Sequence, residues 1–500
     1  MSKSTKTNPS DIPTSPQLLL SVTTKAAYNL YLHPLHNHPG PALSACTDLI
    51  YWYHFLSGTI HLHLDALHAQ YGEVVRFGPD RLSFVHPQAW KDIYGHRTAA
   101  RKTAPPAKDP KFYGATGSAE RGRACSLAAI LDDAEHGRVR RIFSHAFSDR
   151  GLKEQEPLIR GYVDKLVASL RVSQGASVDM VALYNCTTFD VMGDLTFGES
   201  LGLLEASELN SWVSNMFRGI KSAVLGQMSR EYPLIGRVIF MLVPASLKKM
   251  MVEHQQYSRE RVERRLAKQG TELERPDIWG LVLKQEEGRG LTLNEMHAQA
   301  GLFMIAGTET TATLLSGLTF LLLKNPDKLS KLAGEVRRSF DSDDQLTIEN
   351  LRKLKYMHAC FEEAFRMYPP VPIGLPRVIP DGGASVLGQW VPGKTRVSVP
   401  QWAAYRSSLN FKDPLSFIPE RWLPDSGFDT DRRDILQPFS VGPRNCIGQN
   451  LAYHEMRLIL AKVLWHFDLS MGHENDGWLD QKCFALWEKY PLLAKVIARV

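Results

Sequence analysis

Cys446 stands in a pattern of residues that could hold a metal ion. It belongs to the segment Phe439-Ser-Val-Gly-Pro-Arg-Asn-Cys-Ile-Gly448, which a run with apolar residues at helical spacing follows. We therefore expect the cysteine at a helix N-terminus, where free peptide N–H groups and the helix dipole favour a thiolate over a thiol. Gly442 and Gly448 lack a Cβ and would let the backbone approach a flat ligand. Arg444 offers paired donors to a carboxylate, so the pattern suits an iron porphyrin with its propionates.

An acid and an alcohol are adjacent in the most apolar part of the chain. The segment 301–323 is predicted to be a buried helix and not a membrane span, because it carries Glu309 and five threonines and a charge at mid-segment is costly in lipid. The glycine and the hydroxyls of Ala306-Gly-Thr-Glu-Thr-Thr311 can loosen the helical hydrogen bonds and open a kink. Glu309 and Thr310 at such a kink could relay protons into a dry cavity.

Two further segments carry charged residues whose pairing the sequence leaves open. Apolar residues at helical spacing predict a helix over 351–368, which a Pro-Pro pair ends. Glu363 and Arg366 are neighbours on that helix. Taken alone, such a pair is typical of an exposed ion pair with little effect on stability. The segment Pro419-Glu-Arg-Trp422 follows downstream.

Together these segments resemble the cytochrome P-450 family. The segment 439–448 matches the family's cysteine loop, Phe-x-x-Gly-x-Arg-x-Cys-x-Gly, at every fixed position, and 306–311 resembles its oxygen-binding helix. From about Tyr28 the likeness covers nearly the whole chain, and a looser one points to fungal microsomal members related to isotrichodermin hydroxylases, which tailor secondary metabolites. The resemblance implies a haem-thiolate monooxygenase that inserts one oxygen atom from O2 into a small apolar substrate. NADPH would supply electrons through NADPH-cytochrome P-450 reductase, with cytochrome b5 as a further donor.

The resemblance also implies a role for each matching residue. Cys446 would be the axial ligand of haem b, and Glu309 and Thr310 would be the acid and the alcohol of proton delivery. Arg421 would join Glu363 and Arg366 in a buried triad that supports the cysteine loop. The remaining haem contacts that it implies are Phe439, Gly442, Gly448, Ala306 and Gly307 and, for the propionates, Arg444, Arg377, Arg140 and His136, the last standing where many members have Trp.

The pattern of elements predicts a mainly α protein with a small β part. The resemblance makes this the cytochrome P-450 fold, a large helical domain and a small β-rich subdomain around a buried haem. A hairpin is expected from 73–77 and 81–85, and a second strand pair from 385–391 and 396–399. We expect residues 1–27 to be a tail and 28–500 to form the domain.

The substrate pocket is expected where loops and helices meet above the haem. The segment from about 96 to 135 has no periodic pattern and is predicted to be a long loop that covers a site. Phe303 and Met304 on the buried helix, and Val371, Ile373 and Leu375 in the following turn, are the expected lining residues. Such residues define an apolar cavity but not a molecule, and they do not separate hydroxylation from epoxidation or ring formation.

The composition limits the classes of binding partner and the cell compartment that we expect. The chain is 44% hydrophobic and 22% charged, with a net charge of +6 that no basic block concentrates, so nucleic-acid binding is not expected. Six scattered cysteines indicate a reducing compartment and no disulfide framework. No N-terminal transmembrane anchor is visible, yet the microsomal resemblance implies the cytosolic face of the endoplasmic reticulum. We expect a monomer that contacts the membrane through apolar patches such as Leu49 to Leu56.

Two other functions stay open at this stage. A haem-thiolate isomerase or dehydratase would rearrange its substrate without O2, but it would not need the Glu309–Thr310 pair. A haem-binding sensor or carrier would have no turnover. Substrate-driven NADPH consumption would separate the sensor from an enzyme.

Overall fold

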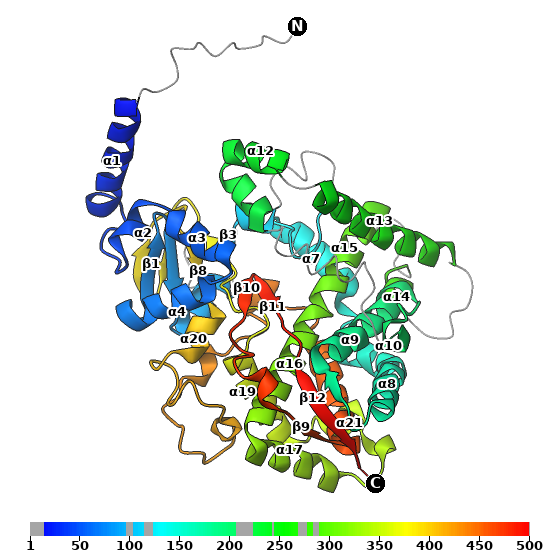
Figure 1. Ribbon diagram of the computed structural model, residues 1–500. Coiled ribbons are helices and arrows are strands. Elements are labelled where there is room, and N and C mark those ends of the chain that lie inside the picture. Colours follow the sequence, from blue (N-terminus) through cyan, green and yellow to red (C-terminus); the bar gives the residue numbers. More distant parts are fainter. Residues whose placement is uncertain are drawn as a thin grey trace.

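The structure is a computed structural model that describes residues 15–96, 104–114, 124–206, 224–242, 245–268, 278–283 and 290–499. Helices dominate it (Figure 1), which confirms the expected mainly α class. The longer helices are α1 (Ser15–Tyr31), α4 (Ile60–Tyr71), α7 (Asp133–Ser144), α8 (Asp149–Val172), α9 (Met180–Phe197), α12 (Pro233–Leu242), α13 (Ala245–Ala267), α15 (Leu293–Ala306), α16 (Glu309–Lys324), α17 (Pro326–Ser339), α19 (Lys355–Met367) and α21 (Gln449–His466). The shorter ones are α2 (Ala42–Cys46), α3 (Leu49–Ser57), α5 (Gln88–Tyr94), α6 (Pro110–Tyr113), α10 (Leu203–Ala206), α14 (Ile278–Leu283), α18 (Ile348–Leu351) and α20 (Gln401–Arg406).

The main sheet lies beside the helical body, next to α2, α3 and α4 (Figure 1). Its strands are β1 (Val74–Gly78), β2 (Arg81–Phe84), β8 (Arg396–Ser398), β5 (Arg377–Val378) and β3 (Ala107–Lys108), in that order. The predicted hairpin is confirmed, since β1 and β2 pair antiparallel from Val74 opposite Phe84.

The second predicted strand pair is wrong. The segment 385–391 does not pair with 396–399, because it contains a hairpin of its own, β6 (Ala384–Val386) with β7 (Gln389–Val391). Its turn residues Leu387 and Gly388 have φ of 52° and 75°, which is the two-residue turn that suits the twist of a hairpin. The strand at 396–398 is β8, which pairs with β2 and β5.

Four strands near the C-terminus were not predicted from the sequence. β9 (Phe467–Ser470) and β12 (Leu493–Ala498) form a sheet with β4 (Ser177–Asp179), and β10 (Lys482–Phe484) pairs with β11 (Leu486–Glu488). Most of these strands have only three or four residues, which is too short for a clear alternation of apolar and polar residues.

The buried helix predicted over 301–323 is two helices with a break. α15 ends at Ala306 and α16 begins at Glu309, so the predicted kink at Gly307 is confirmed. The Thr308 and Thr310 hydroxyls donate to the carbonyl oxygens of Met304 and Ala306, as threonine side chains do where they compete with the helical ladder. Residues 311–323 are all buried, against α9, α19 and α21.

The helix predicted over 351–368 starts later than expected. Leu351 ends α18, and α19 runs from Lys355 to Met367 before the Pro-Pro pair. The predicted loop 96–135 contains β3 and α6 between its irregular parts; its residues 97–103 and 115–123 lie outside the described residues.

The first helix extends away from the body of the protein (Figure 1), and it runs through the predicted boundary at residue 27. The hydrophobic side chains of α1 are mostly exposed, as at Leu19 (66%) and Leu20 (68%). Among the described residues, no helix has the length and the apolar character that a bilayer crossing needs.

Candidate active site

A cavity of about 370 Å³ lies between the cysteine loop and the α15–α16 break. Its size is within the range of small-molecule sites. The helices α7, α15, α16 and α21, the turn 370–377 and β3 contribute to its wall. Of the sequence-predicted residues, the wall includes Cys446, Arg444, Arg377, His136, Arg140, Phe439, Gly448, Ala306, Gly307, Thr310, Phe303, Val371 and Leu375.

Besides the predicted triad Glu363, Arg366 and Arg421, four predicted site residues lie outside the wall. Met304 is fully buried outside the cavity wall. Ile373 lines a second, small pocket beside α3 and β8. Gly442 and Glu309 also lie outside the wall. Leu127, Phe147, Met192 and Leu302 also line the cavity. Leu127 lies in the loop that was expected to cover the site and Leu302 adjoins Phe303, whereas Phe147 and Met192 come from segments that no motif marks.

The cysteine loop is held in shape by its own backbone. The Cys446 amide donates to the Phe439 carbonyl at 2.9 Å. Ser440 and Gly442 have φ of 60° and 78°, the left-handed region that glycine adopts easily. A Cβ on Gly442 would lie 2.1 Å from the carbonyl oxygen of Tyr94. Gly442 is thus required by the neighbouring backbone of α5, and not by the approach of a ligand as the sequence suggested.

The Cys446 thiol faces the cavity at the start of α21. Burial raises its pKa, and the Gly448 N–H and the charge of Arg140 only partly oppose this. The Gly448 N–H thus acts in the direction expected of a helix terminus, but it does not outweigh burial. A bound metal ion deprotonates a coordinating thiol, so ionisation depends on ligation.

Basic side chains gather on one side of this thiol. The five in the cavity wall are Lys108, His136, Arg140, Arg377 and Arg444. Burial and the nearby charges of Arg444 and Lys108 lower the pKa of His136 to about 3, so it is neutral. Arg377 is 6% exposed, and its Nε has no hydrogen-bond partner among the described residues. Such a cluster is electrostatically complementary to an anionic ligand.

Two of the arginines also position the loop. Arg140 donates to the carbonyl and side-chain oxygens of Asn445, at 2.6 and 2.7 Å. Arg444 donates to the carbonyl oxygen of Leu131 and to Asp133 Oδ1. These bonds fasten α7 and the segment before it to the cysteine loop.

Lys108 was not found from the sequence. It lies on β3 directly opposite Arg377 and is 8% exposed. Burial, Arg377 and Arg444 lower the pKa of its ammonium group to about 7. Its Nζ donates to the Ala128 carbonyl at 2.6 Å. No sequence signal marks it, because it sits in a stretch without periodicity.

The predicted acid and alcohol face different surroundings. Thr310 lies in the cavity wall. Glu309 is 2% exposed, and its Oε1 accepts from Lys489 Nζ at 2.8 Å and from Thr313 Oγ1 at 3.3 Å. Burial raises the pKa of Glu309, and Lys489 opposes the rise.

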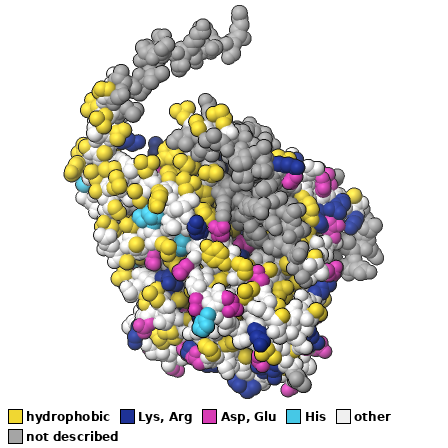
Figure 2. Space-filling model, viewed as in Figure 1, with side chains coloured by type: hydrophobic (Ala, Val, Ile, Leu, Met, Phe, Trp, Pro, Cys, Tyr) yellow, Lys and Arg dark blue, Asp and Glu magenta, His cyan; other side chains and the backbone are white. Residues whose placement is uncertain are grey.

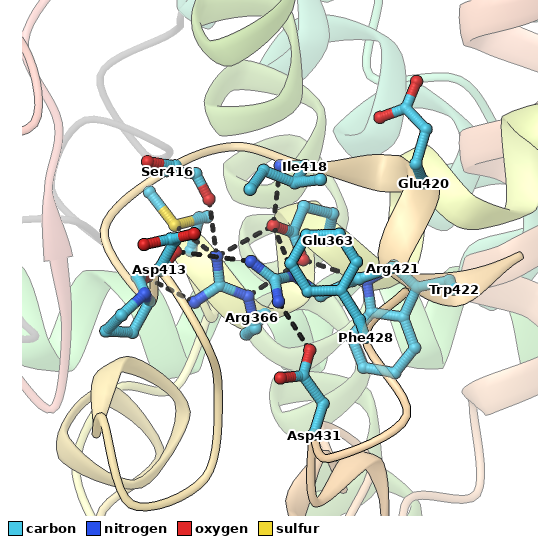
Figure 3. A network of polar contacts seen from close by, with 12 residues as sticks. Glu363, Arg366, Asp413, Ser416, Ile418, Glu420, Arg421, Trp422, Phe428 and Asp431 are labelled. Atoms are coloured by element: carbon cyan, nitrogen blue, oxygen red, sulfur yellow. Dashed lines mark hydrogen bonds and ion pairs between the residues drawn. The ribbon is translucent and has the colours of Figure 1, made fainter. Parts of the chain in front are cut away.

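A fully buried network of charges joins α19 to the segment 413–431 (Figure 3). The Glu363 carboxylate accepts two bonds from Arg366, each at 2.8 Å, and one from Arg421 Nε at 3.1 Å. The Ile418 amide and the Trp422 indole also donate to it, at 2.8 and 2.9 Å. The three charged residues that the sequence singled out are thus in contact.

Asp431 is a fourth charged member of the network, and the sequence did not mark it. Its Oδ2 accepts from Arg421 Nη1 at 2.5 Å, and both side chains are fully buried. Two acids therefore balance two arginines in this network, which is what burial of ion pairs requires. Glu420 points away from the cluster (Figure 3) and pairs with Lys331 at the surface.

The residues of the cavity fit one kind of group. A single thiol, an apolar wall and a cluster of buried bases would suit a flat metal macrocycle with two carboxylates, whose metal ion the thiol would bind. Fold and site together define a mainly α protein built around a haem with a thiolate ligand.

The chain belongs to the cytochrome P450 family, whose model "Cytochrome P450" matches residues 39–493. It is 51% identical to cytochrome P450 monooxygenase FUM2 of Gibberella moniliformis over 94% of this chain and 98% of that protein. Cytochrome P450 monooxygenase AMT3 of Alternaria alternata is 47% identical, over 97% and 98% of the two chains. Averantin hydroxylase of Dothistroma septosporum is 43% identical, over 96% and 90%.

Membership of this family and the likeness to these relatives establish the class of reaction. The protein is a haem-thiolate monooxygenase that binds haem through a cysteine thiolate, uses O2 and receives electrons from a reductase. This agrees with the first of the three functions considered from the sequence.

Proposed function

We propose that Cys446 is the axial haem ligand and that the enzyme oxidises a small apolar molecule of fungal secondary metabolism. The observation that carries the proposal is that Cys446 is the cysteine, among the described residues, whose side chain lines the apolar cavity. With an axial thiolate, haem iron activates dioxygen and favours cleavage of the O–O bond. Where the substrate lies in the cavity decides whether hydroxylation, epoxidation or ring formation follows.

The test is the absorption of the reduced protein with carbon monoxide. We expect the band of a thiolate-bound haem, and its loss in Cys446→Ser. Cys125→Ser, a cysteine that also lies near the cavity but outside its wall, is the control and should keep the band. An unchanged band in Cys446→Ser would contradict the ligand assignment.

The basic side chains hold the propionates in this proposal. Arg377, Arg444 and Arg140 donate charge-assisted hydrogen bonds, His136 donates as a neutral group, and Lys108 joins them. Phe439, Gly448, Ala306 and Gly307 form contacts with the faces of the ring. Gly442 contributes by shaping the loop.

In this proposal Thr310 is the alcohol that delivers protons, and Glu309 is the acid that supplies them to Thr310. Support comes from the position of Thr310 in the wall beside the helix break. For Glu309 to act, its carboxyl group must exchange the contact with Lys489 for one with Thr310. Thr310→Ala should release more hydrogen peroxide per NADPH consumed, and unchanged coupling would contradict this role.

Substrate contacts come from the apolar part of the wall. Phe303, Val371 and Leu375 are the predicted residues there, and Phe147 and Leu302 add to them. Met304 is buried outside the wall and Ile373 lines the second pocket, so neither belongs to the substrate site. A spectral screen of apolar metabolites against the haem band would identify the ligand class.

The electron donor in this proposal is NADPH-cytochrome P450 reductase, with cytochrome b5 as a second donor, and the enzyme acts as a monomer. Arg141, exposed on α7 next to the arginine that binds Asn445, supports docking near the cysteine loop. Arg138 on the same helix contributes less charge to this surface, because it is paired with Glu135 and Glu295.

We place the enzyme at the cytosolic face of the endoplasmic reticulum through peripheral contact. Hydrophobic side chains gather over α1 and at the upper edge over α12 in Figure 2. This apolar surface comprises Leu19, Leu20, Val22, Tyr31, Leu49, Tyr53, Leu234, Val238 and Met241, all at least half exposed. Large exposed apolar patches mark interaction sites. Leu20→Glu should weaken sedimentation with phospholipid vesicles, whereas Val172→Glu on α8, equally exposed but distant, should not.

A further inference from the structure

An oxidisable side chain lies directly behind the part of the cavity wall that Phe439 forms. The rings of Phe365 and Phe439 belong to the wall. Both contact the ring of Tyr453 on α21, with ring centroids 5.8 and 5.3 Å apart. A phenol loses an electron far more easily than a benzene ring does. Along this path, Tyr453 is therefore the side chain that can give up an electron to a group in the cavity.

The hydroxyl of Tyr453 has a base that can receive its proton. It donates to Glu362 Oε1 at 2.6 Å, the length of a bond between a hydroxyl and a charged carboxylate. Burial and the charge of Glu362 raise the pKa of Tyr453 well above its usual range, so the phenol keeps its proton until it is oxidised. A phenol that loses an electron becomes a strong acid, and Glu362 lies within the distance that proton transfer requires.

Glu362 connects this hydroxyl to the surface of the protein. It lies on α19, and its side chain is 17% exposed. One turn earlier on α19, His358 is 51% exposed, with Nδ1 3.8 Å from Glu362 Oε1. The guanidinium group of Arg457 lies over the ring of Tyr453, 4.7 Å from its centre. An electron donor in solution, and an anionic one above all, can therefore approach the tyrosine from this side.

Another tyrosine beside the cavity lacks this kind of proton acceptor. Tyr94 is buried, and its hydroxyl donates to the backbone carbonyl of Leu375 at 2.8 Å. A carbonyl oxygen accepts a hydrogen bond, but it is too weak a base to take the proton. The carboxylate of Glu362 thus distinguishes Tyr453 from Tyr94 in chemical terms.

We infer that Tyr453, with Glu362 as its proton acceptor, gives the enzyme a second activity: the peroxide-driven, one-electron oxidation of reductants at the surface of α19 and α21. This goes beyond the proposed oxidation of an apolar substrate and needs only the haem that the family binds. Hydrogen peroxide takes two electrons at the haem and, with two protons from solvent, leaves as two molecules of water. Each electron comes from Tyr453, whose hydroxyl proton moves to Glu362. The tyrosyl radical then takes an electron from the reductant, and the proton returns from Glu362.

The first test detects the radical and needs neither reductase nor substrate. The haem-loaded protein, frozen directly after mixing with hydrogen peroxide, should show the electron paramagnetic resonance signal of a tyrosyl radical. Tyr453→Phe keeps the ring contacts, so it should abolish this signal while the carbon monoxide band stays normal. Tyr94→Phe is the matched control and should keep the signal. A signal that survives Tyr453→Phe, or that Tyr113→Phe in the cavity wall removes instead, would overturn the proposal.

The second test measures the activity with ferrocyanide as the reductant. We expect two ferrocyanide ions to be oxidised for each hydrogen peroxide consumed, and Tyr453→Phe to remove most of this activity. Glu362→Gln should lower the rate by about tenfold or more, because the proton acceptor is lost, and Glu362→Asp should restore part of it. Glu349→Gln, at an exposed acid on α18, should leave the rate unchanged.

A merely structural contact between Tyr453 and Glu362 predicts different results. It would leave the ferrocyanide rate of Tyr453→Phe equal to that of the unmodified protein, and that outcome would contradict the proposal. The reaction should also slow in D2O, because the electron leaves Tyr453 together with a proton. Failure of the proposed function is recognised separately, by a carbon monoxide band that survives Cys446→Ser.

Discussion

At the scale of single residues, the basic side chains of the cavity repel one another until an anion joins them. Lys108 shows this most clearly, because Arg377 and Arg444 add to burial in lowering its pKa to about 7. The ring of Tyr113, 4.6 Å from Nζ, compensates weakly. A propionate would supply the missing negative charge and restore the charged form of Lys108.

Lys108→Met should therefore weaken haem retention without unfolding the protein. A lost charge-assisted hydrogen bond corresponds to about tenfold faster transfer of haem to an acceptor protein such as apomyoglobin. Lys111→Met is the control, since Lys111 is on α6 and pairs with Glu231 outside the cavity. Equal transfer rates for the two variants would exclude Lys108 as a propionate contact.

Asp431 should be as important to folding as the three residues that the sequence marked. Asp431→Ala would leave Arg421 buried with one acid in place of two, which costs about 3–5 kcal/mol. We expect a large fall in the denaturant midpoint and in haem content. Asp429→Ala, at an exposed acid two positions away, should change the free energy of unfolding by about 0.5 kcal/mol or less. Similar losses in both variants would show that the network tolerates an unbalanced charge.

At the scale of elements, local patterns could be predicted and contacts between distant segments could not. The α15–α16 break follows from glycine and threonines within one segment, and the cysteine loop from one motif. The hairpin at 384–391 was misplaced because its turn uses Leu387 at φ 52°, a residue that no turn pattern favours. Lys108 was missed because its role depends on Arg377 and Arg444, which are distant in the sequence, and Asp431 because no motif marks it as a partner of Arg421.

The close contact of α16 with the end of α19 gives a prediction at this scale. A Cβ on Gly317 would lie 2.3 Å from the ring of Tyr368, which is fully buried and stacked on Trp487. Gly317→Ala should therefore destabilise the protein by about 1–3 kcal/mol through overpacking. The same change at Gly161 on α8, where a Cβ would meet nothing, should stabilise it by about 0.5–1 kcal/mol. Chemical denaturation of both variants checks the sign, and stabilisation by Gly317→Ala would refute the packing argument.

At the scale of the whole molecule, the exposed surface carries two features that lie far apart along the chain. The apolar surface of α1, α3 and α12 includes no residue of α7, where Arg141 is exposed and the preceding Arg140 binds Asn445 of the cysteine loop. A protein held at a membrane by the apolar surface can still present Arg141 to a soluble reductase domain. The two contacts should then be independent of each other.

Electron transfer from an acidic reductase domain should accordingly depend on salt. Opposite charges speed diffusional encounter, and ions screen them beyond about 8 Å at physiological ionic strength. We expect the stopped-flow reduction rate, at limiting reductase, to fall by about tenfold or more as salt rises from low to molar concentration. Arg141→Glu should lower the rate at low salt and flatten this dependence. Lys249→Glu, on α13 and 77% exposed, should leave both the rate and its salt dependence unchanged. A reduction rate of the unmodified protein that does not change with ionic strength would rule out charge-guided docking at this surface.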